Sequence, residues 1–477
     1  MPKQNQWTSR LGFLLAAAGA AIGLGNLWKF PYLMGRNGGF PFLIAYLIFI
    51  VLLGVPVMML EMSLGRYSGK DPVSSYKKVH PRAGIAGFTG VLAAFIILSY
   101  YSVIGGWILK YIFSYLTTFS APANFDAFKA SPETVLWHFL FMAATALICL
   151  RGVGAIEKAS KFMMPTLFVC LLAVIIRSVT LPGALEGLQF MFTPSASQDG
   201  SGFSLSSVSA ALGQVFYSLS LCMGITITYG SYLRKDENIF STAVWVVALD
   251  TAAALLGGLA IFPAVFAMQL APDAGPGLIF NVLPATFYRI PGGMGWVWAG
   301  LFFLMMTIAA LTSAAALLES GVTFLMDQFK FRRVPTVLCT YAGITLLGFL
   351  TCYSTNHWDN LPGVDRFVRN VFNVRTGSWF DLLDKLTSNW MLPLLGLLTV
   401  IFVGWIWGAR KAGRELREGT HGFADENLIT LLSGFRGEPR YMDSANSGLT
   451  VLTLWGLLVR YVAPVIMATI FIQVITA

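Results

Sequence analysis

The sequence predicts an all-α protein that spans a membrane many times and in which two spanning helices are broken near their centres. Hydrophobic residues make up 56% of the 477 residues and charged residues only 12%. The mean hydropathy is +0.69, a value that soluble domains of this length do not reach. Apolar windows of about 20 residues, the length that crosses a bilayer, recur along the chain. Two of these windows carry glycine and polar residues at their middle.

The first broken window is FLLAAAGAAIGLGNLWKFP, residues 13–31, which is interrupted by Gly23, Gly25 and Asn26. Glycine tolerates backbone conformations that other residues avoid, so a helix can open here. Opened backbone inside a bilayer needs burial in protein and partners for its free N–H and C=O groups. The alternative is a close helix crossing through small residues such as Ala16, Ala20 and Gly23. No cleavage site followed by a soluble domain appears, so we expect this segment to be retained rather than removed as a signal peptide.

Eleven spans are predicted, near residues 11–34, 40–65, 88–118, 134–151, 161–180, 206–233, 239–270, 295–326, 334–353, 382–409 and 447–474. With a cytoplasmic N-terminus, most of the 32 Lys and Arg residues fall in loops on the inner side, as the positive-inside rule requires. The odd number of spans then puts the C-terminus outside. This distribution accounts for the net charge of +9 without a nucleic-acid partner.

The loops are too short to hold a soluble domain, so residues 1–477 are predicted to form one transmembrane domain. The longest polar stretches are 352–381, predicted to lie outside, and 410–446, predicted to lie inside. Residues 271–293 are amphipathic with Pro and Gly at their bends, which fits a re-entrant helical hairpin and a plain connector equally well. The five cysteines have no CxxC spacing, so neither a disulfide framework nor a zinc site is indicated.

A second broken window lies five spans after the first. The segment LGQVFYSLSLCMG, residues 212–224, carries Gln214, Ser218, Ser220 and Gly224 around its centre. Broken helices at corresponding places in two successive halves are typical of inverted-repeat transporters with a binding site at the membrane midplane. The halves are predicted to be residues 11–180 and 206–409, with 447–474 as a peripheral eleventh helix.

Six motifs give the chain a family resemblance. It is similar to the neurotransmitter:sodium symporter family of the LeuT type in AAIGLGNLWKFP (20–31), NGGFPFLIAY (37–46), EMSLGRYSG (61–69), YYSVIGGW (100–107), GQVFYSLSLCMG (213–224) and ALTSAAA (310–316). The resemblance implies the five-plus-five inverted-repeat fold with broken helices 1 and 6. It also implies sodium-coupled uptake, with about two Na⁺ ions, and a bacterial inner-membrane location among eleven-helix amino-acid transporters.

The resemblance implies a first sodium site at the first break. Its ligands would be the carbonyl of Ala21, the side chains of Asn26 and Ser218, and the substrate carboxylate. Oxygen atoms from opened backbone, amides and hydroxyls are what a hard, dehydrated cation requires. In the seventh span the family has Asn, whereas this sequence offers Asp250 within about a residue of that position.

Asp250 also bears on chloride. Chloride-dependent relatives hold the anion near the residues that match Tyr46, Gln214 and Ser218, and Asp250 would supply that negative charge covalently. We therefore expect no chloride requirement. An intramembrane acid is functional by default, and the alternative is that Asp250 lies at a helix end in headgroup water.

A second sodium site is implied by the TS motif of the eighth span. Its ligands would be the carbonyls of Gly19, Ile22 and Ala309 and the hydroxyls of Thr312 and Ser313. Outside this family context, such hydroxyls usually bond back to the preceding turn of their own helix.

The substrate is expected to be a neutral, hydrophobic L-amino acid, aliphatic or aromatic. Monoamine-transporting relatives have Asp where Gly23 stands, so the substrate must bring its own carboxylate, which suits the free N–H groups of a half-helix. The apolar lining with its flexible thioether fits such a side chain, and Met223 stands where LeuT has a larger Phe. The residues expected to contact the substrate are Ala20, Gly23, Gly25, Ile97, Tyr101, Tyr217, Ser218, Ser220, Met223, Ser313 and Leu317.

Two charge pairs match the gates of the family. Lys29 and Asp384 match its outer pair, with Lys replacing a bidentate Arg. Tyr232 and Asp327 match its inner latch, for which Lys3 is a candidate partner and Trp7 a candidate plug. A solvated surface charge is the alternative for Lys3.

Glu61, in the second span, is predicted to accept hydrogen bonds from the opened backbone. The alternative is a protonated side chain packed between helices.

Two other classes of protein remain as alternatives. An intramembrane enzyme lacks support, because none of the four histidines pairs with a membrane Asp or Ser. A channel or receptor would not need two inverted broken helices. The sequence does not predict which amino acid is carried, the ion stoichiometry or the oligomeric state.

Overall fold

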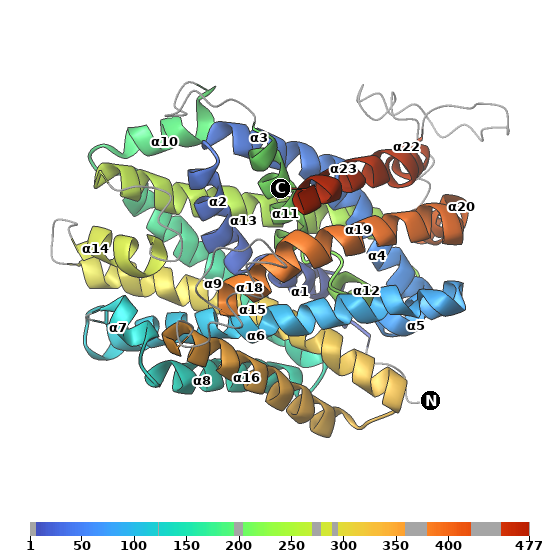
Figure 1. Ribbon diagram of the computed structural model, residues 1–477, viewed down its shortest axis with the longest axis horizontal. Helices are drawn as coiled ribbons and strands as arrows, with labels where there is room; N and C mark the ends of the chain where they lie inside the picture. The colour runs from blue at the N-terminus through green and yellow to red at the C-terminus, as the bar shows by residue number, and fades with distance from the viewer. Residues whose placement is uncertain are drawn as a thin grey trace.

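The computed structural model describes residues 6–122, 124–194, 204–269, 278–288, 294–357, 379–420 and 450–476. The helices run mostly along the long axis of the molecule (Figure 1). In the first half they are α1 Arg10–Ala21, η1 Gly25–Lys29, α2 Phe30–Arg36, α3 Phe40–Phe49, η2 Ile50–Gly54, α4 Val55–Ser68, α5 Pro72–Val79, η3 Pro81–Ala83, α6 Gly84–Thr117, α7 Phe125–Lys129, α8 Glu133–Cys149, α9 Val153–Val179 and α10 Ala184–Phe192. The label η marks π-helical and 3₁₀ segments.

The second half contains the elements from residue 205 onward. They are α11 Leu205–Ser218, α12 Ile225–Ser231, α13 Ile239–Ala267, η5 Leu278–Val282, α14 Leu283–Tyr288, α15 Gly295–Phe329, α16 Arg333–His357, α18 Trp379–Lys385, η7 Leu386–Met391, α19 Leu392–Ile401, η8 Phe402–Gly408, α20 Ala409–Arg417, α22 Val451–Leu457, η10 Leu458–Val462 and α23 Ala463–Thr476.

The structure does not confirm the count of eleven spans. Among the described residues, eight helices are long and apolar enough to cross a membrane, or nine if the bent pair at residues 10–36 is one span. The other two predicted spans fall on shorter elements. One is α8, with 17 residues, and the other is the pair α11 and α12, with 14 and 7 residues.

The first predicted break is present. Helix α1 ends at Ala21, and the chain becomes helical again at Gly25 after a bend of 45°. Ile22 has an extended backbone with φ −73° and ψ 100°, which ends the helical pattern. The close crossing considered as the alternative is also present at Gly23, because a Cβ atom there would lie 2.9 Å from Cβ of Ser313. The small residues therefore serve both the break and the packing.

The second predicted break lies between α11 and α12. Ser220, Cys222 and Gly224 have φ angles of 53°, 65° and 72°, so this segment cannot continue as a right-handed helix. Glu61, fully buried on α4, accepts a hydrogen bond from the backbone N–H of Cys222 at 3.1 Å. It accepts another from the hydroxyl of Thr226. The prediction that Glu61 serves the opened backbone is confirmed.

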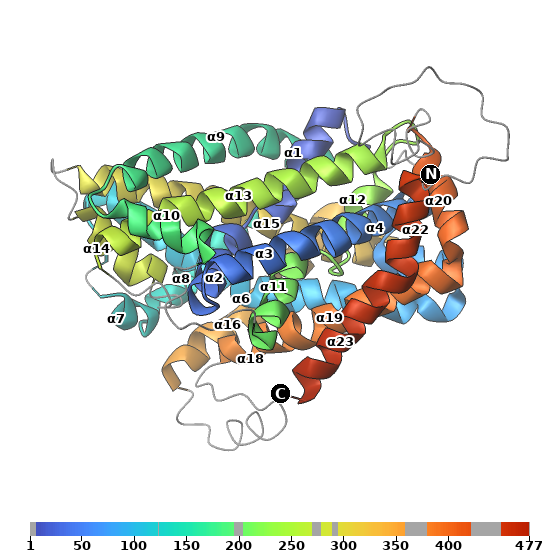
Figure 2. The ribbon, with the colours of Figure 1, turned by 90° about the horizontal axis from the view of Figure 1, so that it is seen from above.

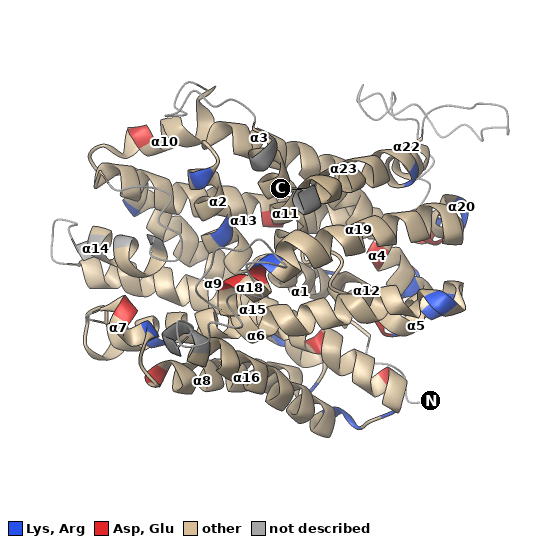
Figure 3. Ribbon diagram, in the orientation of Figure 1, with Lys and Arg blue, Asp and Glu red and all other residues tan. Residues whose placement is uncertain are grey.

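The two breaks lie at the centre of the bundle. Helix α15 packs on α6, α9 and α1, and α13 packs on α1, α9 and η1. Helices α22 and α23 lie at the edge, along η8 and α19 (Figure 2). Lys and Arg residues gather on α5 and α20 at one end of the bundle (Figure 3). The long helices therefore form a scaffold around two short unwound segments.

The segment predicted as a re-entrant hairpin or connector is described only in part. Residues 278–288 form η5 and α14, which contact each other and α15. The Tyr111 hydroxyl donates to the carbonyl of Phe280 at 2.9 Å. The remainder of 271–293 lies outside the described residues, as do most of 352–381 and most of 410–446.

Candidate functional site

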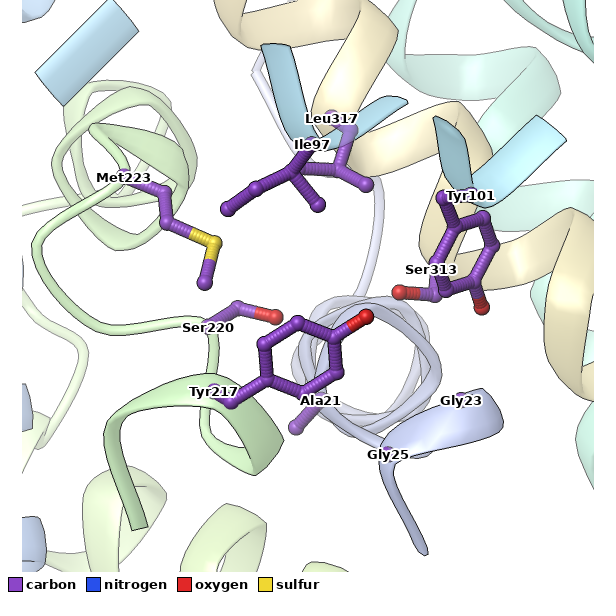
Figure 4. Close-up of a pocket in the computed structure, with 10 residues that line it drawn as sticks. All are labelled: Ala21, Gly23, Gly25, Ile97, Tyr101, Tyr217, Ser220, Met223, Ser313 and Leu317. Atoms are coloured by element: carbon purple, nitrogen blue, oxygen red, sulfur yellow. The ribbon is translucent and has the colours of Figure 1, made fainter. Parts of the chain in front are cut away.

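A small pocket lies between the two broken helices. It is lined by Ala21, Gly23, Gly25, Ile97, Tyr101, Tyr217, Ser220, Met223, Ser313 and Leu317 (Figure 4). This set contains all the residues predicted to contact the substrate except Ala20 and Ser218. The carbonyl of Ala20 lies just behind the lining, where it accepts a hydrogen bond from the Ser220 hydroxyl at 3.0 Å.

One side of the pocket is polar and built from unwound backbone. The N–H of Leu24 donates to the Tyr101 hydroxyl at 3.2 Å. A Cβ atom on Gly23 would come within 2.9 Å of that hydroxyl and within 2.9 Å of Cβ of Ser313. Any side chain at position 23 would therefore fill the polar side, so glycine keeps it open to a ligand.

The opposite side of the pocket is apolar. Figure 4 shows Ile97 and Leu317 together on one wall and the thioether of Met223 extending into the pocket. The carbonyl of Met223 accepts a hydrogen bond from the Ser320 hydroxyl at 3.3 Å, which fixes the backbone on which this side chain is carried. This wall is therefore apolar and carries a flexible side chain that can adapt to the shape of a ligand.

Asp250 lies beside the first break. It is fully buried within α13, so its position at a helix end in headgroup water is excluded. Its carboxylate accepts hydrogen bonds from Nδ2 of Asn26 at 2.8 Å and from the Ser218 hydroxyl at 2.9 and 3.0 Å. The Tyr46 hydroxyl donates to it at 3.4 Å. Donors from three separate elements thus converge on one buried carboxylate.

The surroundings of Asp250 supply the oxygen atoms that a sodium ion requires. Oδ1 of Asn26 accepts from the N–H of Gly23 at 3.0 Å, and Ala21 lines the adjoining pocket. Nε2 of Gln214 donates to the carbonyl of Gly25 at 2.8 Å. Carboxylate, hydroxyl, amide and carbonyl oxygens gathered at opened backbone are suitable ligands for a hard cation. The residues predicted for the first sodium site are therefore brought together.

The residues predicted for the second sodium site lie where α1 meets α15. Thr312 and Gly19 are in close contact across this junction, and Ile22 ends the helix beside it. The Thr312 hydroxyl donates to the carbonyls of Ile308 and Ala309, both at 3.1 Å. Ser313 faces Gly23. The residues predicted as ligands therefore meet at this junction, but the Thr312 hydroxyl bonds back to its own helix, as the alternative interpretation describes.

At one end of the pocket, Lys29 and Asp384 form an ion pair. Nζ of Lys29 is 2.8 Å from Oδ1 of Asp384, and it lies 4.0 Å from the centroid of the Tyr217 ring. The Tyr100 hydroxyl also donates to Asp384, at 3.1 Å. The pair closes the pocket from this side, with the ring of Tyr217 directly beneath the ammonium group.

Trp7 packs near the start of α1, where its ring lies 5.3 Å from that of Phe13. Its indole N–H donates to the carbonyl of Tyr229 at 3.2 Å, and its ring lies 5.2 Å from that of Tyr229 and 6.3 Å from that of Tyr232. Trp7 is 6% exposed, which fits the predicted plug. Lys3 lies outside the described residues.

The structure does not join Tyr232 to Asp327. The Tyr232 hydroxyl bonds to Glu319 at 3.3 Å and to Thr323 at 3.0 Å, whereas Asp327 accepts from the backbone N–H of Asp71 at 2.8 Å.

The sequence interpretation missed Glu319, which lies beside Tyr232. This buried acid pairs with Arg333 at 2.6 Å, and together they connect α15 with α16. An acid inside the predicted eighth span was the signal that could have identified it.

Known proteins are similar to this chain over most of its length. The family model described as "Sodium:neurotransmitter symporter family" matches residues 4–126 and 132–435. The chain is 35% identical to the uncharacterized sodium-dependent transporter YhdH of Bacillus subtilis, over 99% of this chain and 98% of that protein. It is 29% identical to the sodium- and chloride-dependent GABA transporter 2 of Rattus norvegicus, over 86% of this chain and 74% of that protein.

A solved structure is similar over the whole chain. The crystal structure of MhsT in complex with L-phenylalanine matches with a TM-score of 0.83 and 39% identity, covering 99% of this chain and all of that one. This likeness confirms the predicted fold class, an all-α membrane protein with a LeuT-type inverted repeat in which the first and sixth spans are broken.

Proposed function

Because this chain belongs to the sodium:neurotransmitter symporter family, and is a sodium-dependent, multi-pass membrane transporter rather than an enzyme, we propose that it imports a neutral, hydrophobic L-amino acid. The pocket between the two broken helices is the observation that carries this proposal. One side offers the Tyr101 hydroxyl and unwound backbone near Gly23, and another wall carries the apolar side chains of Ile97, Met223 and Leu317. A ligand that fits must have a carboxylate at one end and an apolar group at the other.

The similar protein MhsT was solved with L-phenylalanine, which supports an aromatic or large aliphatic side chain for this substrate too. Two sodium ions would accompany it. The first binds among Ala21, Asn26, Ser218 and Asp250, and the second among Gly19, Ile22, Ala309, Thr312 and Ser313. Asp250 makes chloride unnecessary, because it supplies a permanent negative charge beside the first ion.

We further propose that transport proceeds by alternating access between the two closed ends of the pocket. The ion pair of Lys29 and Asp384 is the outer gate. Trp7, packed against Tyr229 and Tyr232, is the inner gate. The gathering of Lys and Arg on α5 and α20 (Figure 3) supports a cytoplasmic location for that end, with the N-terminus inside and the C-terminus outside. Residues 11–180 and 206–409 are the inverted repeats, and 447–474 is the peripheral helix.

The proposed substrate class is tested by binding of radiolabelled L-phenylalanine to the purified protein in sodium chloride and in potassium chloride. We expect saturable binding in sodium only. Unlabelled leucine and tryptophan should displace the label, whereas phenethylamine should not, because it lacks the carboxylate. Displacement by phenethylamine as strong as by leucine would contradict the proposed role of the polar side of the pocket.

Met223 is expected to set the size of the side chain that the pocket accepts. Replacing Met223 with Phe adds bulk to the apolar wall, and about one methylene in such a pocket is worth 1 to 3 kcal/mol. We expect Met223→Phe to weaken the binding of tryptophan about tenfold relative to that of leucine in the same competition assay. Met326→Phe, on α15 but outside the pocket, is the matched control. Identical competition profiles for Met223→Phe and the parent protein would remove Met223 from the binding site.

A further inference from the structure

An arginine, Arg460, is exposed on the surface of the C-terminal membrane span. The span runs over Val451–Gln473, and Arg460 falls in its π-helical segment η10. Nine residues separate it from Val451, the first residue of that span, which is about 13 Å along a helix. The residue is exposed at the surface of the bundle. A charged side chain on the lipid-facing surface of a membrane span is costly unless something compensates it.

Two aromatic rings hold the guanidinium group. Its Cζ atom lies 4.5 Å from the centroid of the Trp405 ring and 5.4 Å from that of the Tyr461 ring. The indole N–H of Trp405 donates to the backbone carbonyl of Arg460 at 3.1 Å. Trp405 and Tyr461 are 53% and 49% exposed. These three residues are called the Arg460 clamp below.

The clamp supplies no negative charge. In the described part of the chain, the ion pairs between side chains do not include Arg460. Aromatic faces attract a cation but leave the N–H donors at the edge of the guanidinium plane free to bind an acceptor. Phosphate oxygens match this planar fork of donors. The missing partner is therefore an anion that can reach a lipid-facing surface.

The packing of η8 and α20 against α22 and η10 shows from which side that anion comes. A Cβ atom on Gly456 would lie 3.8 Å from Cβ of Ala409, and one on Gly404 would lie 3.2 Å from Cα of Arg460. The helices are thus antiparallel, and Arg460 lies four residues, about 6 Å, deeper than the start of α20. Side chains on a helix lean toward its N-terminus, so Arg460 leans toward α20.

Helix α20 adds positive charge at the nearby surface. Arg410, Lys411 and Arg414 are exposed on it, whereas Ala412 and Leu416 are buried, so its basic face points away from the bundle. Helix α20 also contacts α22. An acyl chain can lie along the exposed apolar residues of α19 and α23, such as Leu398 and Val465, while its headgroup reaches the basic residues.

We propose that the Arg460 clamp and the basic face of α20 bind the headgroup phosphate of an anionic phospholipid. Trp405 and Tyr461 orient the guanidinium group, Arg460 binds the phosphodiester, and the α20 residues attract the headgroup. This site is separate from the substrate pocket and does not depend on the proposed substrate.

The proposal is tested by native mass spectrometry of the full-length protein titrated with phosphatidylglycerol or phosphatidylcholine. We expect the parent protein to bind its first phosphatidylglycerol more tightly than phosphatidylcholine. In Arg460→Gln, the dissociation constant for phosphatidylglycerol should rise about fivefold, as expected for one basic residue near an anionic surface. Arg460→Lys should be intermediate, because charge remains but the planar fork is lost.

Arg151→Gln is the matched control, because Arg151 is exposed in the turn between α8 and α9, outside the helices that form the clamp. It should leave the lipid affinity unchanged. Soluble glycerol phosphate should not displace the lipid, which separates lipid binding from free phosphate binding. Equal lipid affinities in Arg460→Gln and the parent protein would overturn the proposal. A change of Arg460→Gln from dimer to monomer without a change in lipid affinity would assign the surface to a second copy of the chain instead, which also overturns it.

Discussion

Replacing Asp250 with serine is expected to weaken sodium-dependent substrate binding at neutral pH by about a hundredfold or more. The change removes a negative charge from a fully buried place, where a cation and a substrate carboxylate are proposed to meet. Opposite charges about 4 Å apart interact by about 4 kcal/mol at an effective dielectric constant of 20. The Asp250→Ser change also leaves Asn26 and Ser218 without the carboxylate acceptor that both now use.

Chloride should partly restore binding to Asp250→Ser. The new hydroxyl, together with Tyr46, Gln214 and Ser218, offers donors for an anion of the same charge, and similar proteins such as the rat GABA transporter 2 are described as chloride-dependent. The measurement is L-phenylalanine binding in sodium gluconate and in sodium chloride. The parent protein should bind equally in both, and Asp250→Asn should show a smaller recovery. A parent protein that needs chloride, or an Asp250→Ser protein that binds normally in gluconate, would show that Asp250 does not replace the anion.

Glu61 is expected to be the carboxylate whose removal most reduces thermal stability. It accepts from the Cys222 N–H and the Thr226 hydroxyl, and both donors are buried in the second break. Glu61→Ala leaves them unpaired, and such losses cost about 2 to 5 kcal/mol. Glu61→Gln keeps one acceptor oxygen, so it should be less destabilised.

The measurement for Glu61 is the midpoint of thermal unfolding in detergent, followed by circular dichroism. Glu186→Ala is the matched control, because Glu186 is an exposed helical carboxylate on α10. We expect the order of midpoints to be parent and Glu186→Ala highest, then Glu61→Gln, then Glu61→Ala. A Glu61→Ala protein as stable as the Glu186→Ala control would show that Glu61 does not hold the break.

The breaks were predictable because each puts glycine and polar residues inside an apolar window, a local pattern with a direct backbone consequence. The position of Asp250 was not predictable to the residue. Helix α13 is apolar around most of its circumference, so its sequence does not say which face meets the first break. That face is determined by contacts with Asn26 and Ser218, which lie far away in the chain.

Glu319 could be singled out as an acid inside an apolar span, but its pairing with Arg333 could not be predicted, for a similar reason. Glu319 and Arg333 belong to different helices, and they meet because of the way the chain turns between α15 and α16. The span count also depends on tertiary structure. Helix α8 and the pair α11 and α12 are each shorter than a typical membrane span. Their role as spans therefore depends on how they pack with the other helices.

The most direct test of the proposed function is uptake of radiolabelled L-phenylalanine into proteoliposomes that contain the purified protein. We expect an inward sodium gradient to drive accumulation above the external concentration, and we expect potassium in place of external sodium to abolish it. Liposomes without protein and liposomes with Asp250→Ser in gluconate should show only the background signal. Uptake by the parent protein at the same rate and to the same level with and without the sodium gradient would contradict sodium-coupled amino-acid import.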